Sequence, residues 1–257
     1  YFINYFNSVN CKITLTKKCP ICYNYNKIWW FLTMIGIVIA LQSEAKSLLN
    51  KIDELNPIPL ADKHCYQGKI NGYDVVVAIS GIGKVSAGLT TQLLIDKFNP
   101  DFIINAGTCG GMDNSVQVLD YYIVDKACQF DFDLRELDNV PLGYIQEYNT
   151  VFFPTYTNGL DFMKKSSVAS ADRFTNCLSD INSILEMGCK LRDMEGGAIG
   201  QVCTSNNVKL VMIKGVTDVT GSKTAGEQFY QNLTTVCDGL ADVIINVLIT
   251  VAKDLCK

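Results

Sequence analysis

Three stretches of the chain carry acidic side chains close to apolar runs, and these acids are the residues best able to do chemistry. Glu44 comes shortly after the apolar run Met34–Ala40. Asp193 and Glu195 stand in the sequence DMEGG, and Asp218 follows a second apolar run. Two carboxyl groups in unlike surroundings can serve as general acid and general base. Taken singly, each acid also has a structural explanation as a first-turn helix residue or a turn residue.

Metal chemistry has little support in the sequence. The single histidine, His64, excludes an HExxH zinc site and a multi-histidine metal centre. It lies in a polar stretch, where a solvated or hydrogen-bonded histidine is expected. Cys19 and Cys22 have the spacing of metal ligands, but no second pair follows, so zinc or redox chemistry is a weak alternative. We therefore predict a site without a metal ion.

Composition and charge narrow the class of protein. The 257 residues are 48% apolar and 19% charged, which permits a sizeable core. There are 22 basic and 26 acidic residues without a dense basic run, so a nucleic-acid partner is not expected. The 11 cysteines are scattered and odd in number, which favours reduced thiols in a cytoplasmic protein.

Apolar runs that alternate with glycine turns predict an α/β fold with a parallel sheet covered by helices. Buried strands are expected at 34–40, 73–79, 102–106, 121–124, 167–170 and 210–216. Helices are expected from Ser43, a candidate N-cap, and at 85–98, 177–187, 195–204 and 225–254. Ligands of such sheets bind outside the carboxyl ends of the strands, where the acids stand.

Two glycine-rich segments and one aromatic segment are expected to form loops. The segment 80–84 (SGIGK) lacks the spacing of phosphate-binding motifs. The segment 107–111 (GTCGG) is expected to be a turn that lets a ligand approach the backbone. Residues 131–160 are rich in aromatic side chains and are expected to form a lid or a subunit contact.

The front of the chain differs from the rest. Residues 1–33 show no clean amphipathic period, and we interpret them as an N-terminal appendage, either non-native or disordered, before a single domain at 34–257. The run Trp29–Leu41 is too short to span a bilayer, and no small-residue cleavage site follows it. We therefore expect no membrane segment there.

Five segments in order along the chain are specific enough to indicate a family. They are IGIVIALQSEA (35–45), SGIGKVSA (80–87), PDFIINAGTCGG (100–111), DMEGGAIGQV (193–202) and KGVTDVTGSKTAGEQFYQNL (214–233). Together they resemble the 5′-methylthioadenosine/S-adenosylhomocysteine nucleosidases of the nucleoside phosphorylase-like superfamily, and the last two are especially similar to the plant-type branch. The resemblance implies a three-layer αβα sandwich around a mixed, mostly parallel twisted sheet.

The resemblance also implies a reaction and a role for several residues. The family hydrolyses the N-glycosidic bond of these nucleosides to release adenine, as a homodimer without metal or cofactor. By position, Asp218 would protonate adenine N7 and Glu44 would activate the attacking water. Glu195 would hold the ribose hydroxyls, with Met194 against the sugar. The other implied site residues are Ile82, Thr108, Cys109, Gly110, Phe174 stacked on the base, Thr175 bonded to the base, Asp193, and Lys214 near the water.

The chain departs from the family pattern at three glycines. Gly197 and Gly200 stand where alanines are usual, which is expected to loosen that helix by up to about 1 kcal/mol each. Gly226 stands near a position where bacterial members place an aromatic residue against the alkylthio group. That contact is therefore expected to come from elsewhere, for example from a partner subunit. The plant-like ending favours methylthioadenosine over S-adenosylhomocysteine.

Two alternatives stay open. A purine nucleoside phosphorylase shares the fold but needs cationic ligands for phosphate, and the loop at 80–85 offers only Lys84. A non-catalytic nucleoside-binding or storage relative would not need Glu44, Glu195 and Asp218 together.

Overall fold

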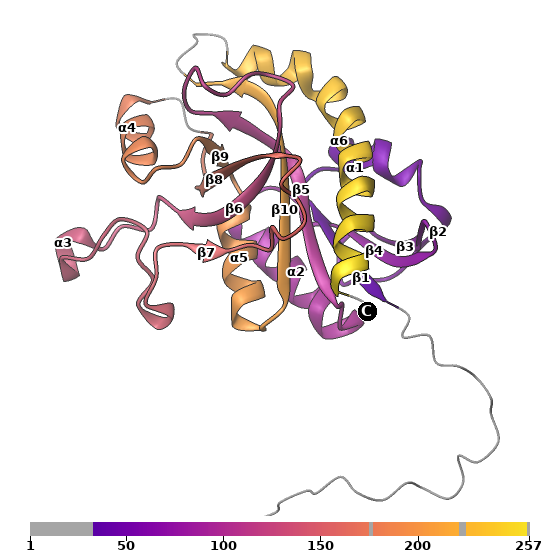
Figure 1. Cartoon of the computed structure of the whole chain (residues 1–257). Coiled ribbons are helices and arrows are strands. Elements are labelled where there is room, and N and C mark those ends of the chain that lie inside the picture. Colours follow the sequence, from indigo (N-terminus) through magenta and orange to yellow (C-terminus); the bar gives the residue numbers. More distant parts are fainter. Residues whose placement is uncertain (1–32, 175–176, 221–224, 256–257) are drawn as a thin grey trace, which may run out of the picture. The chain divides into compact units, whose positions relative to one another are not determined.

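A computed structural model describes residues 33–174, 177–220 and 225–255, in which helices cover both faces of a mixed, ten-stranded sheet (Figure 1). The strands are β1 (Met34–Ile39), β2 (Asp53–Pro57), β3 (Cys65–Ile70), β4 (Tyr73–Ile79), β5 (Phe102–Gly111), β6 (Tyr121–Gln129), β7 (Phe153–Pro154), β8 (Lys164–Ser170), β9 (Leu191–Asp193) and β10 (Lys209–Val219). The α-helices are α1 (Gln42–Leu49), α2 (Lys84–Phe98), α3 (Arg135–Asp138), α4 (Leu178–Glu186), α5 (Gly196–Ser205) and α6 (Ala225–Leu255), with a 3-10 turn, η2 (Gln146–Tyr148). The predicted αβα sandwich is confirmed. The cysteine pair at 19 and 22 lies outside the described residues.

The strand order brings the ends of β5, β9 and β10 together. β1 pairs in parallel with β4 and β5, and β5 pairs in parallel with β10. From β10 the sheet continues through β6 and β8 to β9, which pairs antiparallel with the last residues of β5. A closed ring of five strands is therefore formed, in the order β5, β10, β6, β8 and β9. As a result, Gly110 of β5 pairs in register with both Asp218 and Arg192.

The central strands are apolar on both faces because helices cover both. Ile35, Ile37 and Ile39 of β1 point to a core shared with α1 and α6. Val38 points the other way, to a second core shared with α2 and α5. A strand that is buried on both faces is typically a continuous apolar run, which is why β1 and β4 were predictable from sequence.

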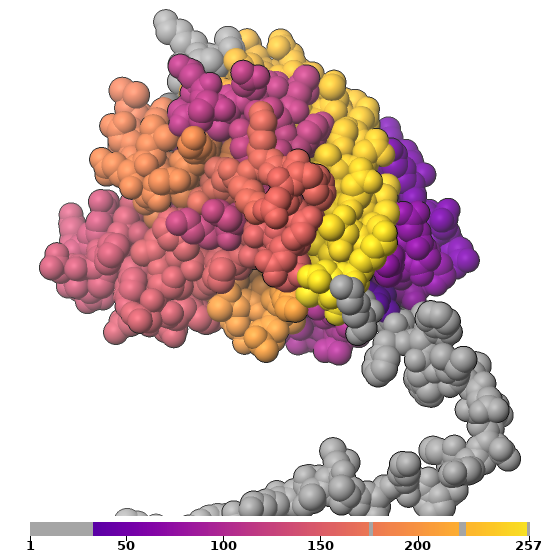
Figure 2. Space-filling view, in the orientation of Figure 1, coloured from indigo at the N-terminus to yellow at the C-terminus, as the bar shows by residue number. Residues whose placement is uncertain are grey.

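Helix α6 is a core helix with one outer face. Its most apolar stretch has a mean hydropathy of 1.8, so by length and composition alone it could span a bilayer. Half of that stretch is buried inside the protein, with Leu240, Ile244 and Val247 packed in the core. Figure 2 shows the remaining face as a yellow band on the surface.

Several local predictions are wrong in instructive ways. The 107–111 segment is not a turn, because β5 runs through Gly111 and its glycines pair with β9 and β10. Ser43 is not the N-cap of α1, which begins at Gln42 with Leu41 in the capping position. Four strands were not predicted: β2 is polar and exposed, β3 is mixed in character, and β7 and β9 have only two and three residues.

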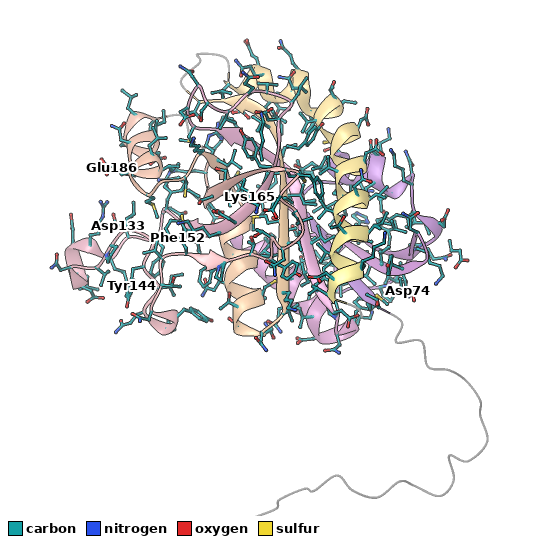
Figure 3. The ribbon with its side chains drawn as sticks, viewed as in Figure 1. Asp74, Asp133, Tyr144, Phe152, Lys165 and Glu186 are labelled. Atoms are coloured by element: carbon teal, nitrogen blue, oxygen red, sulfur yellow. The ribbon has the colours of Figure 1, made fainter. Side chains whose placement is uncertain are left out.

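The aromatic segment at 131–160 does not cover the cavity described below. Figure 1 shows α3 and its neighbouring loops projecting from one end of the sheet, and Figure 3 labels Asp133, Tyr144 and Phe152 on this segment. Phe153 anchors the segment, since its side chain is fully buried. Lys126 Nζ lies 4.2 Å from the centroid of the Phe152 ring. No described residue of the segment lines the cavity, so the prediction of a lid is wrong and that of a subunit contact stays a prediction.

The glycines of α5 are explained by close packing on β6 and β7. A Cβ atom on Gly197 would lie 2.6 Å from the carbonyl oxygen of Cys128, and one on Gly200 would lie 2.9 Å from Cβ of Phe153. Both distances are far below ordinary van der Waals contact. The intrinsic propensity cost of these glycines is therefore offset by the approach of α5 to the sheet.

Candidate active site

A cavity of about 440 Å³ opens at the carboxyl ends of the central strands. It is lined by Ala40, Leu41, Glu44, Ile82, Thr108, Cys109, Gly110, Phe174, Arg192, Asp193, Met194, Glu195, Thr217, Asp218, Gly226, Phe229 and Tyr230. All but two of the site residues expected from sequence are among these. Lys214 lies fully buried beneath the cavity, and Thr175 is outside the described residues.

Glu44 is held by three hydrogen bonds at the start of α1. Its Oε1 accepts from the backbone N–H of Thr108 at 2.8 Å and from the Thr108 hydroxyl at 2.7 Å. Its Oε2 accepts from the N–H of Leu41 at 3.1 Å. A Cβ on Gly107 would lie 3.3 Å from Oε1, so the glycine gives the carboxylate room. This buried carboxylate is thereby fixed as an acceptor that lines the cavity.

Asp218 stands near the end of β10 and is 1% exposed. Its Oδ2 accepts from Arg192 Nη2 at 2.7 Å, and its Oδ1 accepts from the Thr217 hydroxyl at 2.9 Å. Burial raises the pKa of Asp218, and the opposing effects of Arg192 and Thr217 do not cancel that rise. The raised pKa means that Asp218 holds a proton more readily than an ordinary aspartate.

Glu195 and Asp193 line the cavity, and both interact with the buried Lys214. Glu195 Oε1 accepts from the N–H of Gly83 at 2.9 Å, and burial together with the Asp193 carboxylate raises its pKa to about 7. Asp193 Oδ2 lies 2.7 Å from Lys214 Nζ. Burial acts to lower the pKa of Lys214, but Asp193 and Glu195 raise it overall, so the ammonium stays charged.

The glycine loop before α2 uses its anion-binding groups on the protein's own carboxylates. The N–H of Gly83 donates to Glu195, and the N–H of Lys84 donates to Asp172 Oδ1 at 2.7 Å. Lys84 Nζ is paired with Asp131 at 2.5 Å. Backbone N–H groups at a helix N-terminus and a nearby lysine are what a phosphate would need, and here they are already paired.

Aromatic side chains form the apolar part of the cavity wall. Phe174 contributes a ring that is 48% exposed. Phe229 and Tyr230, from the first turns of α6, form an edge-to-face pair with ring centroids 5.3 Å apart. A Cβ on Gly226 would meet no atom within 4 Å. Phe229 and Tyr230 therefore supply an apolar surface to the part of the cavity wall where Gly226 has no side chain.

Sequence reasoning missed Arg192, Phe229 and Tyr230. Arg192 directly precedes the DMEGG motif, but nothing in the sequence indicated the short strand β9 that carries it. Phe229 and Tyr230 stand inside the quoted segment AGEQFYQNL, where two adjacent aromatic residues near a helix start were the available signal.

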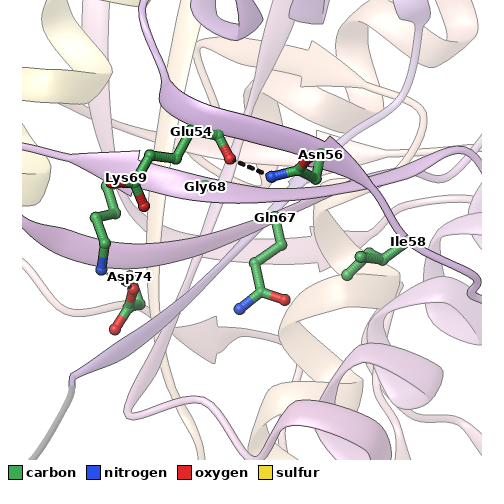
Figure 4. Close-up of a pocket in the computed structure, with 7 residues that line it drawn as sticks. All are labelled: Glu54, Asn56, Ile58, Gln67, Gly68, Lys69 and Asp74. Carbon is green, nitrogen blue, oxygen red and sulfur yellow. Dashed lines mark hydrogen bonds and ion pairs between the residues drawn. The ribbon is translucent and has the colours of Figure 1, made fainter.

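A second cavity of about 220 Å³ lies at the edge formed by β2, β3 and β4 (Figure 4). It is lined by Glu54, Asn56, Ile58, Gln67, Gly68, Lys69 and Asp74. Its charged pair, Lys69 and Asp74 at 2.5 Å, is partly exposed to solvent. This cavity shares no residue with the first and brings no buried carboxyl groups together, so the first is the candidate active site.

Comparison with known proteins agrees with this fold and site. A sequence model of the phosphorylase superfamily matches residues 34–249, and the chain belongs to that superfamily. A 5′-methylthioadenosine/S-adenosylhomocysteine nucleosidase of Staphylococcus haemolyticus is 31% identical over 229 residues, which cover 84% of this chain and 100% of the relative. Within the superfamily, the chain belongs to the family of these nucleosidases.

Solved structures show the same architecture. The nucleosidase of Helicobacter pylori superposes with a TM-score of 0.78 at 24% identity, covering 84% of this chain and 98% of that one. The nucleosidase of Colwellia psychrerythraea, solved in complex with adenine, has a TM-score of 0.77 at 27% identity. It covers 85% of this chain and 95% of that one.

Proposed function

We propose that this protein hydrolyses the N-glycosidic bond of 5′-methylthioadenosine, and of S-adenosylhomocysteine, to release adenine. The observation that carries the proposal is that Glu44, Glu195 and Asp218 line one cavity in different electrostatic surroundings. Relatives of this chain are named for hydrolysis of both nucleosides, and one was solved with adenine.

Asp218 is the proposed general acid. As the bond between N9 and C1′ breaks, its electron pair moves into the purine and Asp218 gives a proton to N7, so a neutral adenine leaves. A raised pKa suits this task, because the acid must hold its proton near neutral pH.

Glu44 is the proposed general base. It accepts a proton from water while the water oxygen bonds to C1′, where oxocarbenium character develops as in glycoside hydrolysis. The donors from Leu41 and Thr108 hold the carboxylate in place for this step. After adenine and the 5-thioribose product leave, Glu44 returns its proton to solvent and Asp218 regains one, so the cycle needs no cofactor.

Glu195 is the proposed partner of the ribose hydroxyls, with Met194 against the sugar. Glu195 Oε1 is occupied by the Gly83 N–H, which leaves Oε2 to accept from a hydroxyl. Lys214 acts through Asp193, whose side chain also accepts from the N–H of Gly196 at 2.9 Å at the start of α5. Lys214 is thus proposed to hold the Asp193 side chain in place without contacting the substrate itself.

The paired glycine loop supports water over phosphate as the nucleophile. A phosphorylase would need free donors where Lys84 and its neighbours are bound to Asp131, Asp172 and Glu195. The convergence of three acids on one cavity favours an enzyme over a storage or binding relative.

Further properties are proposed with the reaction. Residues 34–257 form the catalytic unit. A homodimer is proposed because Ile82, which lines the cavity, and Val85 and Leu89 of the following helix α2 are at least half exposed. A cytoplasmic role in methionine salvage is proposed with it, and the described cysteines are all free thiols, as a reducing compartment requires. Preference for methylthioadenosine is proposed from the plant-like C-terminal segment.

A free-base assay tests the proposed reaction. Methylthioadenosine, S-adenosylhomocysteine and inosine are compared with and without phosphate, with adenine measured for the first two and hypoxanthine for inosine. Release of adenine in phosphate-free buffer is expected. A strict need for phosphate, or release of hypoxanthine from inosine without release of adenine from the other two, would contradict the proposal.

Asp218→Asn tests the acid. The amide keeps the shape of the side chain but cannot deliver the proton, so kcat is expected to fall by about 10²- to 10⁴-fold. Binding of methylthioadenosine, measured by calorimetry, should remain detectable. Undiminished turnover would remove Asp218 from the mechanism.

A further inference from the structure

We propose that the Arg192 guanidinium occupies the adenine subsite of the unliganded protein and leaves it when the nucleoside binds. The proposal rests on the function proposed above, since it takes the purine to be the ring that enters the cavity. It makes Arg192 a residue that sets the affinity for the base.

Three groups of the cavity define where a purine ring can lie. Phe174 offers the face of an aromatic ring, on which a flat base stacks. Gly110 offers backbone without a side chain, so a flat ring can lie against it. Asp218 must reach N7 from the ring edge. A purine that meets all three requirements lies between Phe174, Gly110 and Asp218.

The guanidinium of Arg192 is in contact with these same three groups. Its Cζ lies 4.5 Å from the centroid of the Phe174 ring. A Cβ on Gly110 would fall 2.6 Å from that Cζ, so the guanidinium lies directly against the Gly110 backbone. Its Nη2 donates to Asp218 Oδ2 at 2.7 Å. The guanidinium and the base therefore cannot occupy this place together.

The chemistry of the two groups explains why one can replace the other. A guanidinium is a planar cation that stacks on aromatic faces and donates to carboxylates. The purine that receives the proton at N7 is also planar and a donor to Asp218. Arg192 thus makes, within the free protein, the contacts that the reacting base makes.

The exchange also ties the protonation of Asp218 to binding. While Arg192 is in place, its charge favours the ionised form of Asp218. When the base takes that place, the buried carboxyl group loses this cation and is left in surroundings that favour its protonated form. The acid is then prepared at the moment when N7 is beside it.

A second anchor holds Arg192 in its resting place. Its Nε donates to the hydroxyl of Thr220 at 2.8 Å, and the side chain is only 7% exposed. The substrate therefore competes with a well-held internal group. The apparent affinity equals the intrinsic affinity multiplied by the fraction of molecules in which the subsite is open.

Calorimetric titration with adenine tests the proposal on wild type, Arg192→Met and the control Arg135→Met. Arg135 is paired with Asp133 at 2.6 Å and does not line the cavity. Arg192→Met is expected to bind adenine about tenfold more tightly than wild type, from the loss of a charge-assisted hydrogen bond and a cation–π contact that compete with the base. Arg135→Met is expected to match wild type.

Unchanged or weaker adenine binding by Arg192→Met would overturn the proposal. Tighter binding would support it, because the loss of a purely structural contact is not expected to tighten binding. If the variant does not fold, crystal structures of the wild type with and without adenine decide the question. The guanidinium should leave Phe174 and Asp218 when adenine is bound; retention of both contacts overturns the proposal. Adenine release by the wild type is measured separately, so failure of the proposed reaction is distinguishable from failure of this inference.

Discussion

The close approach of α5 to the sheet can be tested at Gly197. This helix follows Glu195 and thereby positions that residue in the cavity. In Gly197→Ala the added methyl would lie 2.6 Å from the carbonyl oxygen of Cys128 and 2.8 Å from Gln129 Cγ. Cys128 lies in β6 and is paired with Ala169 of β8. Its carbonyl group therefore cannot move without disturbing the sheet.

Two opposing terms set the size of the effect. Alanine in place of glycine favours the helix by up to about 1 kcal/mol. Overpacking a rigid contact costs about 1–3 kcal/mol, and a clash with strand backbone falls at the upper end. The net expectation is a loss of about 2 kcal/mol in the free energy of unfolding. For a chain of this size that lowers Tm by about 4–8 °C.

Thermal unfolding followed by circular dichroism measures the shift, with Gly88→Ala as the matched control. Gly88 also lies within a helix, α2, but a Cβ there would be 3.7 Å from Val202, an ordinary contact. The control is expected to raise Tm by about 2–4 °C, since it gains helix propensity without a clash. If Gly197→Ala raised Tm as the control does, the packing argument would be refuted.

Three further outcomes are expected. Glu44→Gln should lower kcat by about 10²-fold or more, because an amide cannot take the proton from water; a near-normal rate of adenine release would mean that another group activates the water. Lys214→Met leaves Asp193 and Glu195 buried without a cation and should cost about 3–5 kcal/mol in urea unfolding; a negligible loss would show that these carboxyl groups are neutral. The pKa of Glu195 is raised from 4.5 to about 7, so the folded state binds more protons than the unfolded state between these pH values, and the free energy of unfolding should fall as pH rises through that window. Over the same window nucleoside affinity should rise as the carboxylate forms, and Glu195→Gln should flatten the stability slope; an unaltered slope would assign it to other groups.

The elements that could be predicted from sequence are those whose burial is written into a continuous run. β1 and residues 75–79 of β4 are uninterrupted apolar segments because helices cover both of their faces. The hairpin of β2 and β3 at the sheet edge has no such pattern, since its residues are largely polar or partly exposed. Likewise, the three residues of β9 form a strand only through pairing with β8 and β5.

The acids of the site could be named from sequence because each stands near the end of a strand or the start of a helix, in a recognisable motif. Their partners could not. Arg192 reaches Asp218 only because β9 and β10 both pair with Gly110, and that register depends on closure of the sheet around β5. Phe229 and Tyr230 reach the cavity only through the placement of α6.

The amino-acid sequence by itself therefore determined the fold class, the family and the acidic residues, since these depend on local patterns of burial and on motifs a few residues long. The tertiary structure alone decided which donor meets each carboxyl group, what fills the purine subsite and why α5 needs its glycines. These are contacts between residues distant in the chain, at distances that sheet pairing and helix packing set and that no local pattern records.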